Sequence, residues 1–346
     1  MDKIPGRVFV VFWKIVKAIK NRGRQATPGL NPNFPRIPGT NFLAPGPPLG
    51  LRGFERTPGA TWHLWTQIVG KIRLTQTPWL NHSGHVPLYV TARGLTTSPM
   101  PFGARTFQID FDLIDHRLLI ETSDGAVTTL PLKPRPVADF YRDLMAQLAA
   151  LGLDVRIHTT PNEIVDGIPF EQDQQHASYD AAQAHNFWLA LVQSDRVLKQ
   201  FRAGFIGKCS PVHFFWGSFD LAVTRFSGRT APQHPGGVPH CPDWVMREAY
   251  SHEVSSCGFW PGGEMLPEPL FYAYAYPEPP GFNAAAVRPA GARYNPDLHE
   301  FILPYDEVRR ADAPDTRLLE FLQSSYDAAA NLGTWDRAAL ERTLPA

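Results

Sequence analysis

The sequence is poor in the features that mark several large classes of protein. Charged residues make up only 19% of its 346 residues, and the basic and acidic residues balance at 33 each. Hydrophobic residues reach 43%, which excludes a disordered chain, because disorder needs low hydrophobicity and high net charge. Only three cysteines occur, at wide spacing and without a CxxC pair. Neither a disulfide scaffold nor a zinc ribbon is therefore indicated, and reduced thiols in a cytoplasmic protein are the simplest interpretation.

Several sequence motifs of common enzymes are also missing. No glycine-rich GxGxxG joins a predicted strand to a helix, and neither GxxxxGK[ST] nor GxSxG occurs. A nucleotide-binding fold and an ordinary α/β-hydrolase are therefore unsupported. Residues 1–24 hold seven basic residues against one acidic residue, so they carry +6 and the rest of the chain carries −6. A mildly acidic body argues against nucleic acid as a partner, because phosphates need a basic face.

The N-terminal segment has a composition of its own. Its longest apolar run, Val8 to Trp13, has six residues, whereas a membrane-spanning helix needs about 20. Residues 8–20 read as a basic amphipathic helix suited to an anionic membrane surface, and a disordered extension is the alternative. A Pro/Gly-rich linker follows. We therefore divide the chain into residues 1–60, the amphipathic segment plus linker, and a single globular domain over residues 61–346.

The globular part is predicted to be α+β, with antiparallel sheets flanked by helices. Hydrophobic spacing predicts helices at 62–74, 137–151, 181–204 and 314–332. Alternating or β-branched runs predict strands at 86–95, 106–113, 117–122, 126–130, 212–216, 219–226, 251–257 and 270–276. Two halves, approximately 61–160 and 178–335, each read helix, strands, helix. An internal duplication with a cleft between the halves is one interpretation, and chance recurrence is the other.

The stretch around residues 211–229 is the richest in candidate functional residues. Gly217-Ser218 fits a two-residue hairpin turn, which places Phe215 opposite Asp220. The two-residue period of strands then puts His213 and Asp220 on one face as diagonal neighbours. Such a pair could bind a metal or act as base and orienting group. The alternative is a buried His–Asp hydrogen bond that fixes the sheet register.

A second candidate is His252-Glu253. The two residues begin like the zinc motif HExxH, but Ser256 stands where the second histidine is required. The zinc motif is rejected for that reason. If the segment is a strand, His252 and Glu253 lie on opposite faces, and polar groups on both faces suggest the wall of a pocket.

Two further histidines, His82 and His85, form an HxxH just before a predicted strand. Histidines three apart can share a metal in a turn, but a lone HxxH is a weak signal and a solvated turn explains it better. We name His82, His85, His213 and His252 as the candidate metal ligands, on condition that the fold brings them together. The cofactor stays unknown, with a divalent metal as one option.

Several long segments resemble one bacterial family, among them FDLIDHRLLIETSDG, FRAGFIGKCSPVHFFWGSFDLAVTRFSGR and YSHEVSSCGFWPGG. The family is catalogued as domain of unknown function number 5996, and the resemblance runs from about Thr61 to Glu341. It implies a soluble bacterial protein and carries no assigned activity, so no catalytic roles follow from it.

The functional expectation therefore depends on the residues themselves. The leading hypothesis is a cytoplasmic enzyme or binder with a polar and aromatic cleft for a small molecule. His213, Asp220, His252 and Glu253 are its candidate catalytic residues. A non-catalytic ligand-sensing or interaction module is the rival, and membrane-surface association through residues 8–20 is a third hypothesis. The sequence does not indicate the oligomeric state.

Overall fold

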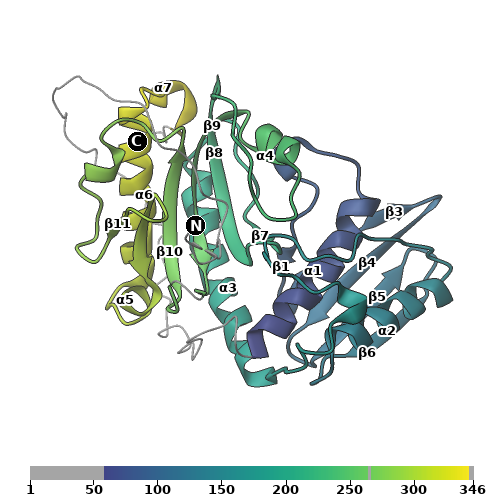
Figure 1. Cartoon of the computed structure of the whole chain (residues 1–346). Coiled ribbons are helices and arrows are strands. Elements are labelled where there is room, and N and C mark those ends of the chain that lie inside the picture. The colour runs from purple at the N-terminus through teal and green to yellow at the C-terminus, as the bar shows by residue number, and fades with distance from the viewer. Residues whose placement is uncertain (1–57, 264–265, 343–346) are drawn as a thin grey trace, which may run out of the picture.

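The protein is built from two antiparallel sheets and the helices that cover them (Figure 1). The computed structural model describes residues 58–263 and 266–342. The predicted amphipathic helix over residues 8–20 lies outside them. The predicted α+β class is confirmed, whereas the two sheets differ in strand order and the duplication stays a prediction. A bilayer-spanning helix is absent from the part of the chain that the structure describes.

The first sheet belongs to the first half of the chain. Its spatial order is β1-β2-β4-β5-β6, with β3 paired to β4. The strands are β1 (Tyr89–Val90), β2 (Gly94–Thr96), β3 (Met100–Phe102), β4 (Arg105–Asp112), β5 (Arg117–Thr122) and β6 (Val127–Pro131). Phe107, Ile109 and Phe111 alternate along β4 and bury one face. Helices α1 (Pro58–Gln76) and α2 (Val137–Ala150) pack against each other and against strands of this sheet. The predicted strand 86–95 is in fact two short strands.

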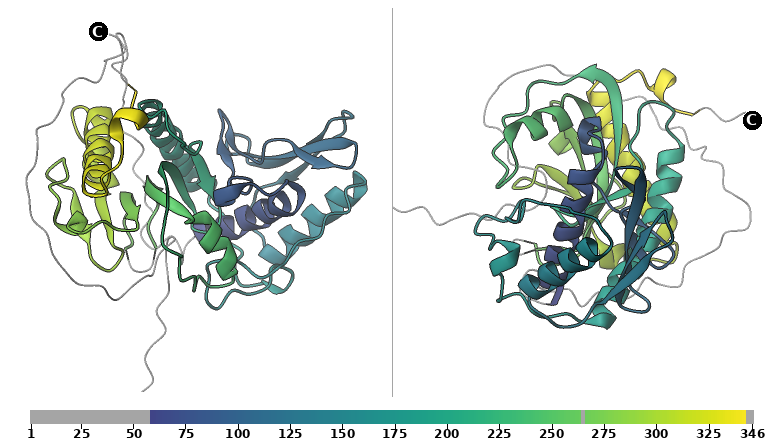
Figure 2. Two further views of the ribbon diagram at one scale, coloured as in Figure 1. Left: turned by 90° about the horizontal axis from the view of Figure 1, so that it is seen from above. Right: turned by 90° about the vertical axis from the view of Figure 1, so that its right-hand side faces the viewer.

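The second sheet has the order β11-β12-β10-β9-β8-β7. Its strands are β7 (His213–Phe215), β8 (Asp220–Thr230), β9 (His252–Trp260), β10 (Leu270–Tyr276), β11 (Arg293–Asn295) and β12 (Glu300–Pro304). Helices α3 (Ala181–Ala203) and α6 (Pro314–Leu332) lie side by side and pack on one face of β8, β9 and β10 (Figure 2, left). The other face carries the candidate site.

Short elements complete the fold. The 3-10 helices are η2 (Asn81–Ser83), η3 (Phe170–Gln172) and η4 (Phe282–Ala284). The remaining helices are α4 (Asp243–Ala249), α5 (Tyr305–Arg309) and α7 (Arg337–Leu340). Of these, η2 and α4 contact each other and cover the candidate site.

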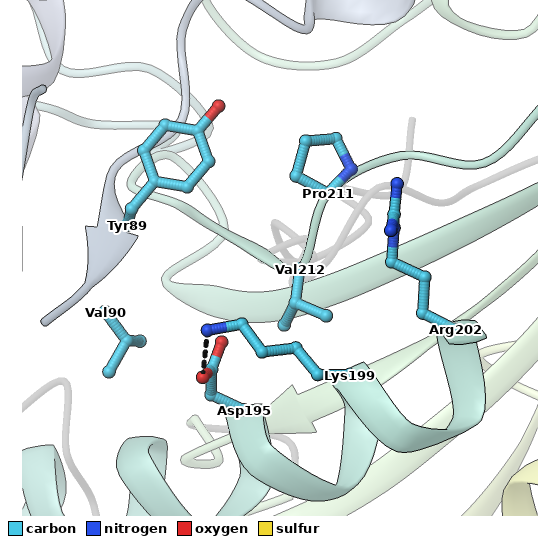
Figure 3. A pocket seen from close by; sticks show the side chains of 7 residues that line it. All are labelled: Tyr89, Val90, Asp195, Lys199, Arg202, Pro211 and Val212. Atoms are coloured by element: carbon cyan, nitrogen blue, oxygen red, sulfur yellow. Dashed lines mark ion pairs between the residues drawn. The ribbon is translucent and has the colours of Figure 1, made fainter.

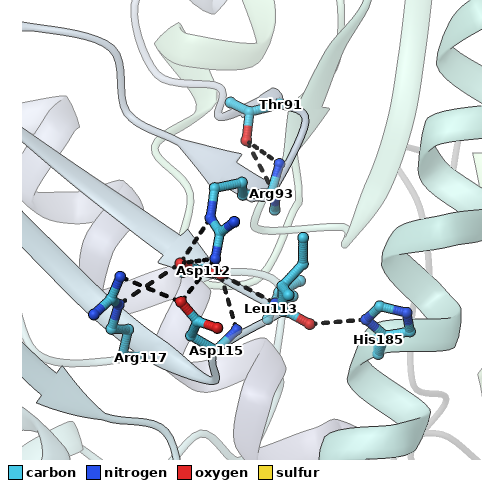
Figure 4. Close-up of polar contacts among 9 residues, drawn as sticks. Thr91, Arg93, Asp112, Leu113, Asp115, Arg117 and His185 are labelled. Atoms are coloured by element: carbon cyan, nitrogen blue, oxygen red, sulfur yellow. Dashed lines mark hydrogen bonds and ion pairs between the residues drawn. The ribbon is translucent and has the colours of Figure 1, made fainter.

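The turn between β4 and β5 is held by opposite charges (Figure 4). Asp112 is buried at the end of β4 and accepts hydrogen bonds from Arg93 Nε at 2.9 Å and from the backbone N–H of Asp115 at 3.0 Å. Arg117 approaches the same carboxylate at 3.6 Å. Burial alone would raise the pKa of Asp112, but the hydrogen bonds outweigh it and hold that pKa below its usual value. The charged cluster therefore fixes this end of the first sheet.

The two sheets are joined directly. Leu88 and Phe214 form an antiparallel bridge, with N–H to carbonyl distances of 2.9 and 2.7 Å. On α3, His185 Nδ1 contacts the carbonyl oxygen of Leu113, next to the charged turn, at 2.9 Å (Figure 4). One hydrophobic core contains buried residues from both halves of the chain. The first half is thus in position to supply a wall to a site on the second sheet.

Candidate functional site

A cavity of about 310 Å³ lies on the face of the second sheet that α3 and α6 leave uncovered. Its floor is made by side chains of β7, β8, β9 and β10, and its roof by the segment that contains η2 and by the end of α4. Residues 208–211 and Tyr89 of β1 close one side. Aromatic rings and a few polar groups line it, which is the usual composition of a small-molecule pocket.

The register of β7 and β8 places the two central candidates as predicted. His213 pairs with Ala222 and Phe215 pairs with Asp220, so the hairpin register is confirmed. His213, Phe215 and Asp220 all line the cavity. The alternating residues of the hairpin, such as Phe214, are buried in the core on the other face. The Gly217-Ser218 turn thus aims an imidazole and a carboxyl into the same space.

Asp220 is held by two hydroxyl donors. Ser218 donates to its Oδ1, and Tyr272 of β10 donates to its Oδ2 from two strands away. Gly258 of β9 lies in the path of this contact, because it pairs with Tyr272 on β10 and, on its other side, with Ala222 of β8. A Cβ on Gly258 would lie 2.5 Å from the hydroxyl of Tyr272, so only glycine leaves the path open.

The carboxyl of Asp220 titrates close to neutrality. Burial raises the pKa of Asp220 to about 6, and the hydrogen bonds from Ser218 and Tyr272 keep it from rising further. A carboxyl with this pKa can exchange a proton at physiological pH, as a general acid or base must. Its position in the cavity wall makes Asp220 the strongest acid–base candidate.

His213 is neutral and unpaired. Its side chain is 2% exposed, and burial lowers the pKa of His213 to about 3, with a further contribution from the positive charges of Arg73 and Arg202. Its Nδ1 is buried without a partner, and no hydrogen bond to the ring is found among the described residues. The alternative His–Asp hydrogen bond is therefore wrong, since Asp220 is bonded to Ser218 and Tyr272 instead. An unpaired imidazole in a cavity wall is a ready partner for a ligand.

A second polar group extends along the floor. Tyr274 contacts the hydroxyl of Tyr250 at 2.8 Å, and Thr224 contacts the hydroxyl of Ser256 at 2.9 Å. The rings of Tyr272 and Tyr274 stack with centroids 6.2 Å apart. These residues line the cavity and provide hydroxyl groups along its length.

Two more carboxyl groups, outside the cavity wall, are influenced by the charge of Asp220. Glu300 of β12 is 2% exposed, and burial together with the negative charge of Asp220 holds the pKa of Glu300 well above its usual value. Burial and the same charge raise the pKa of Glu163 to about 8. The Oε1 of Glu163 lies 2.2 Å from where a Cβ of Gly217 would be, so this carboxyl packs directly on the hairpin turn.

The two parts of the roof, the segment around η2 and helix α4, are joined by side chains of the η2 segment. His82 Nδ1 contacts the carbonyl oxygen of Ala249 at 2.8 Å, and Trp79 Nε1 donates to Glu248 at 2.8 Å. Trp79 also packs on Trp244 of α4, with ring centroids 4.8 Å apart. His82 lines the cavity, and its unbonded Nε2 is buried.

The other predicted site residues lie elsewhere. Glu253 accepts hydrogen bonds from Arg229, one of them at 2.6 Å, on the face away from the cavity. His252 lies near His82, with ring centroids 5.5 Å apart, but is not part of the cavity wall. His85 accepts a hydrogen bond from the Leu80 backbone at 3.2 Å and packs on a tryptophan.

The predicted metal ligands do not converge. His213 pairs with Ala222, which in turn pairs with Gly258 of β9. His252 lies six residues before Gly258 on that strand. At about 3.3 Å per residue, the two histidines are about 20 Å apart along the strand. Among residues 58–263 and 266–342, no three His, Cys, Asp or Glu side chains are grouped closely enough to hold a metal ion.

A smaller hollow of about 260 Å³ borders the cavity (Figure 3). Tyr89 and Pro211 line both spaces. Lys199 extends into the hollow but is paired with Asp195, with Nζ and Oδ2 2.6 Å apart. Arg202 also lines the hollow and donates its Nε to the carbonyl oxygen of Ser210. Because all three charged groups already have partners, this hollow has less to offer a ligand than the cavity.

Sequence reasoning did not connect Asp220 with the other polar groups around it. Tyr272, Glu163, Glu300 and Lys208 were not predicted to act with Asp220. A signal for Tyr272 was Gly258, which directly follows the predicted strand 251–257 and lies inside β9, because a glycine in a strand indicates a close approach by another group. Glu300 was missed together with its strand, β12.

Comparison with known proteins gives one match. A family model that describes only a family of unknown function matches residues 47–342, most of the chain. No curated protein and no solved structure matches. The site must therefore be interpreted from its own geometry.

Proposed function

The chain belongs to the family of unknown function DUF5996, and we propose that it binds a small elongated molecule in the cavity over the second sheet, with Asp220 as the acid–base group. The observation that carries this proposal is the placement of Asp220. The carboxyl is held by Tyr272 and Ser218, opens into a cavity of about 310 Å³ and has a pKa of about 6. Perturbed carboxyls in cavities are typical of functional sites.

The neutral imidazole of His213 supports the same proposal. A carboxyl and an unpaired imidazole on one cavity face can bind a substrate together, one accepting a proton and the other orienting the reacting group. Both side chains sit on paired strands rather than on loops, so their separation is fixed by the sheet.

The free thiols fit a cytoplasmic location, which we propose as well. Cys209, Cys241 and Cys257 are all unpaired. Burial raises the pKa of Cys241 and of Cys257 to about 12, so neither thiol is activated as a nucleophile.

A ligand screen with a matched blocking variant tests the proposed function. Thr224 faces the cavity from β8, so Thr224→Leu should occupy part of it. Ala150→Leu, at the exposed end of α2, adds a leucine far from it. We expect compounds that raise the Tm of the full chain by a few degrees, equally in Ala150→Leu and not in Thr224→Leu. A screen in which no compound distinguishes Thr224→Leu from the unaltered chain would overturn the proposal.

A further inference from the structure

The buried acidic groups of the site lack positive partners. Asp220 and Glu300 are nine-tenths or more buried, and Glu163 packs on the turn beside Asp220. No lysine or arginine forms an ion pair with any of the three among the described residues. A buried carboxylate without a cation is costly, so ionised Asp220 would be stabilised by a ligand that brings a positive charge to it.

The neighbours of Asp220 suit a cation as well. Phe215 lies directly opposite Asp220 in the sheet, so an aromatic ring borders the carboxyl. The neutral, unpaired imidazole of His213, two residues from Phe215 on the same face of β7, can accept a hydrogen bond from an N–H donor. An ammonium group has three such donors, enough to reach both the carboxylate and the imidazole.

A metal ion is a poorer candidate for this positive charge. Within the described ranges, no three carboxylate, imidazole or thiol side chains lie close enough together to bind one. Glu300 and Glu163 feel the negative charge of Asp220, but the three carboxyls do not meet at one point where they could share a metal ion. The cation that fits is therefore an organic one.

The far end of the cavity carries the opposite charge. Asp220 and Phe226 both line it and lie six residues apart on β8, which is about 20 Å along the strand. Lys208 also lines it, with Nζ 5.0 Å from the centre of the Phe226 ring. Aromatic and small side chains lie between the two ends. The cavity thus suits a chain-like molecule that enters with its positive end toward Asp220.

We propose that the ligand of this cavity is a linear organic amine, whose ammonium group binds between Asp220 and His213 while its chain extends toward Lys208. This inference depends on the proposed function, because it names the class of molecule that the same cavity takes.

Three probes of equal length test the charge preference by isothermal titration calorimetry on the full chain. Octylamine, octanol and octanoic acid share a chain and differ in the charge of the head group. We expect octylamine to bind about 10- to 100-fold more tightly than the other two, as a buried charge pair provides. Asp220→Asn should abolish that preference. The matched variant Asp195→Asn, in the neighbouring hollow, should keep it.

The outcomes separate this inference from the proposed function. If octanol binds as tightly as octylamine, or if Asp220→Asn keeps the preference, the cationic ligand is wrong. Compounds whose binding is lost in Thr224→Leu would then still support the cavity as a binding site. Should Asp220→Asn fail to fold, His213→Leu replaces it, with at least a threefold loss expected for octylamine and none for octanol. Equal loss for both probes would overturn the inference.

Discussion

Tyr272 on β10 donates a hydrogen bond to Asp220 on β8 by reaching over Gly258 on the strand between them. The contact joins three strands of the second sheet at the end of the cavity where the carboxyl lies. It couples the pKa of Asp220 to the backbone of β9, because any side chain at position 258 would displace the hydroxyl. The acid–base character of the site thus depends on a residue that has no functional group.

Replacing Gly258 by alanine should destabilise the protein. The added Cβ would lie 2.1 Å from the carbonyl oxygen of Leu221, a backbone atom that cannot move aside alone. We expect a loss of about 1 to 3 kcal/mol in the free energy of unfolding, measured by urea denaturation. Gly84→Ala is the control, because its Cβ would meet no atom closer than 3.4 Å. Equal stability of the two variants would contradict the packing described for β9.

The buried carboxyls should make stability fall as pH rises. The pKa of Asp220, Glu163 and Glu300 is above its usual value in the folded state, so the folded protein holds more protons than the unfolded chain between the two values. Stability is therefore greatest below the unfolded pKa values, near pH 4, and decreases through about pH 6 for Asp220 and about pH 8 for Glu163. Glu300→Gln should raise the free energy of unfolding by about 1 to 3 kcal/mol at pH 8 and by less at pH 5.

Denaturation series at the two pH values measure this effect. Glu121→Gln, on an exposed position of β5, is the control and should change stability equally at both. A Glu300→Gln variant that is less stable than the unaltered chain at pH 8 would show that the Glu300 carboxylate has a favourable partner.

His213→Leu should separate stability from binding. The imidazole is buried with an unbonded nitrogen, and such a group costs about 1 to 3 kcal/mol, so leucine should leave the Tm unchanged or raise it. Binding of octylamine should weaken at the same time. Differential scanning calorimetry and titration of the same sample check both. A clear fall in Tm would favour a structural role for His213.

Amine binding should depend on pH and release protons. Octylamine stays protonated between pH 5 and 8, since alkylammonium groups titrate near 10.4. Asp220 loses its proton near pH 6, with the hydroxyls of Ser218 and Tyr272 and the carboxyls of Glu163 and Glu300 facing it. Affinity should therefore rise about tenfold between pH 5 and pH 7. Titrations at pH 6 in buffers of different ionisation enthalpy should show proton release for octylamine and none for octanol.

Much of the fold could be predicted from local sequence. Residues 270–276 and 314–332 are a strand and a helix with the predicted bounds, because tyrosines alternate in the first and leucines follow the helical period in the second. The hairpin register followed from Gly217-Ser218 alone. Strand β12 was not predicted, since its apolar run is only three residues long, Phe301 to Leu303, and lies between Glu300 and Pro304.

The site was predictable only in part. Pairing rules placed His213 and Asp220 on one face because both lie in a single hairpin. The expectation that His252 would join them had no such basis, since its position along β9 depends on a register that only the folded sheet defines. Contacts between distant segments, such as His82 with Ala249, leave no local pattern in the sequence.

The bridge between Leu88 and Phe214 makes the cavity depend on both halves of the chain. Part of the roof and part of one wall come from residues before position 100, while the floor, its carboxyl and the rest of the enclosure come from residues after position 207. A gene fragment that encoded either half alone would encode an open sheet surface and no enclosed space. A substitution at the Leu88–Phe214 bridge would therefore change the enclosure of the site as well as the contact between the sheets.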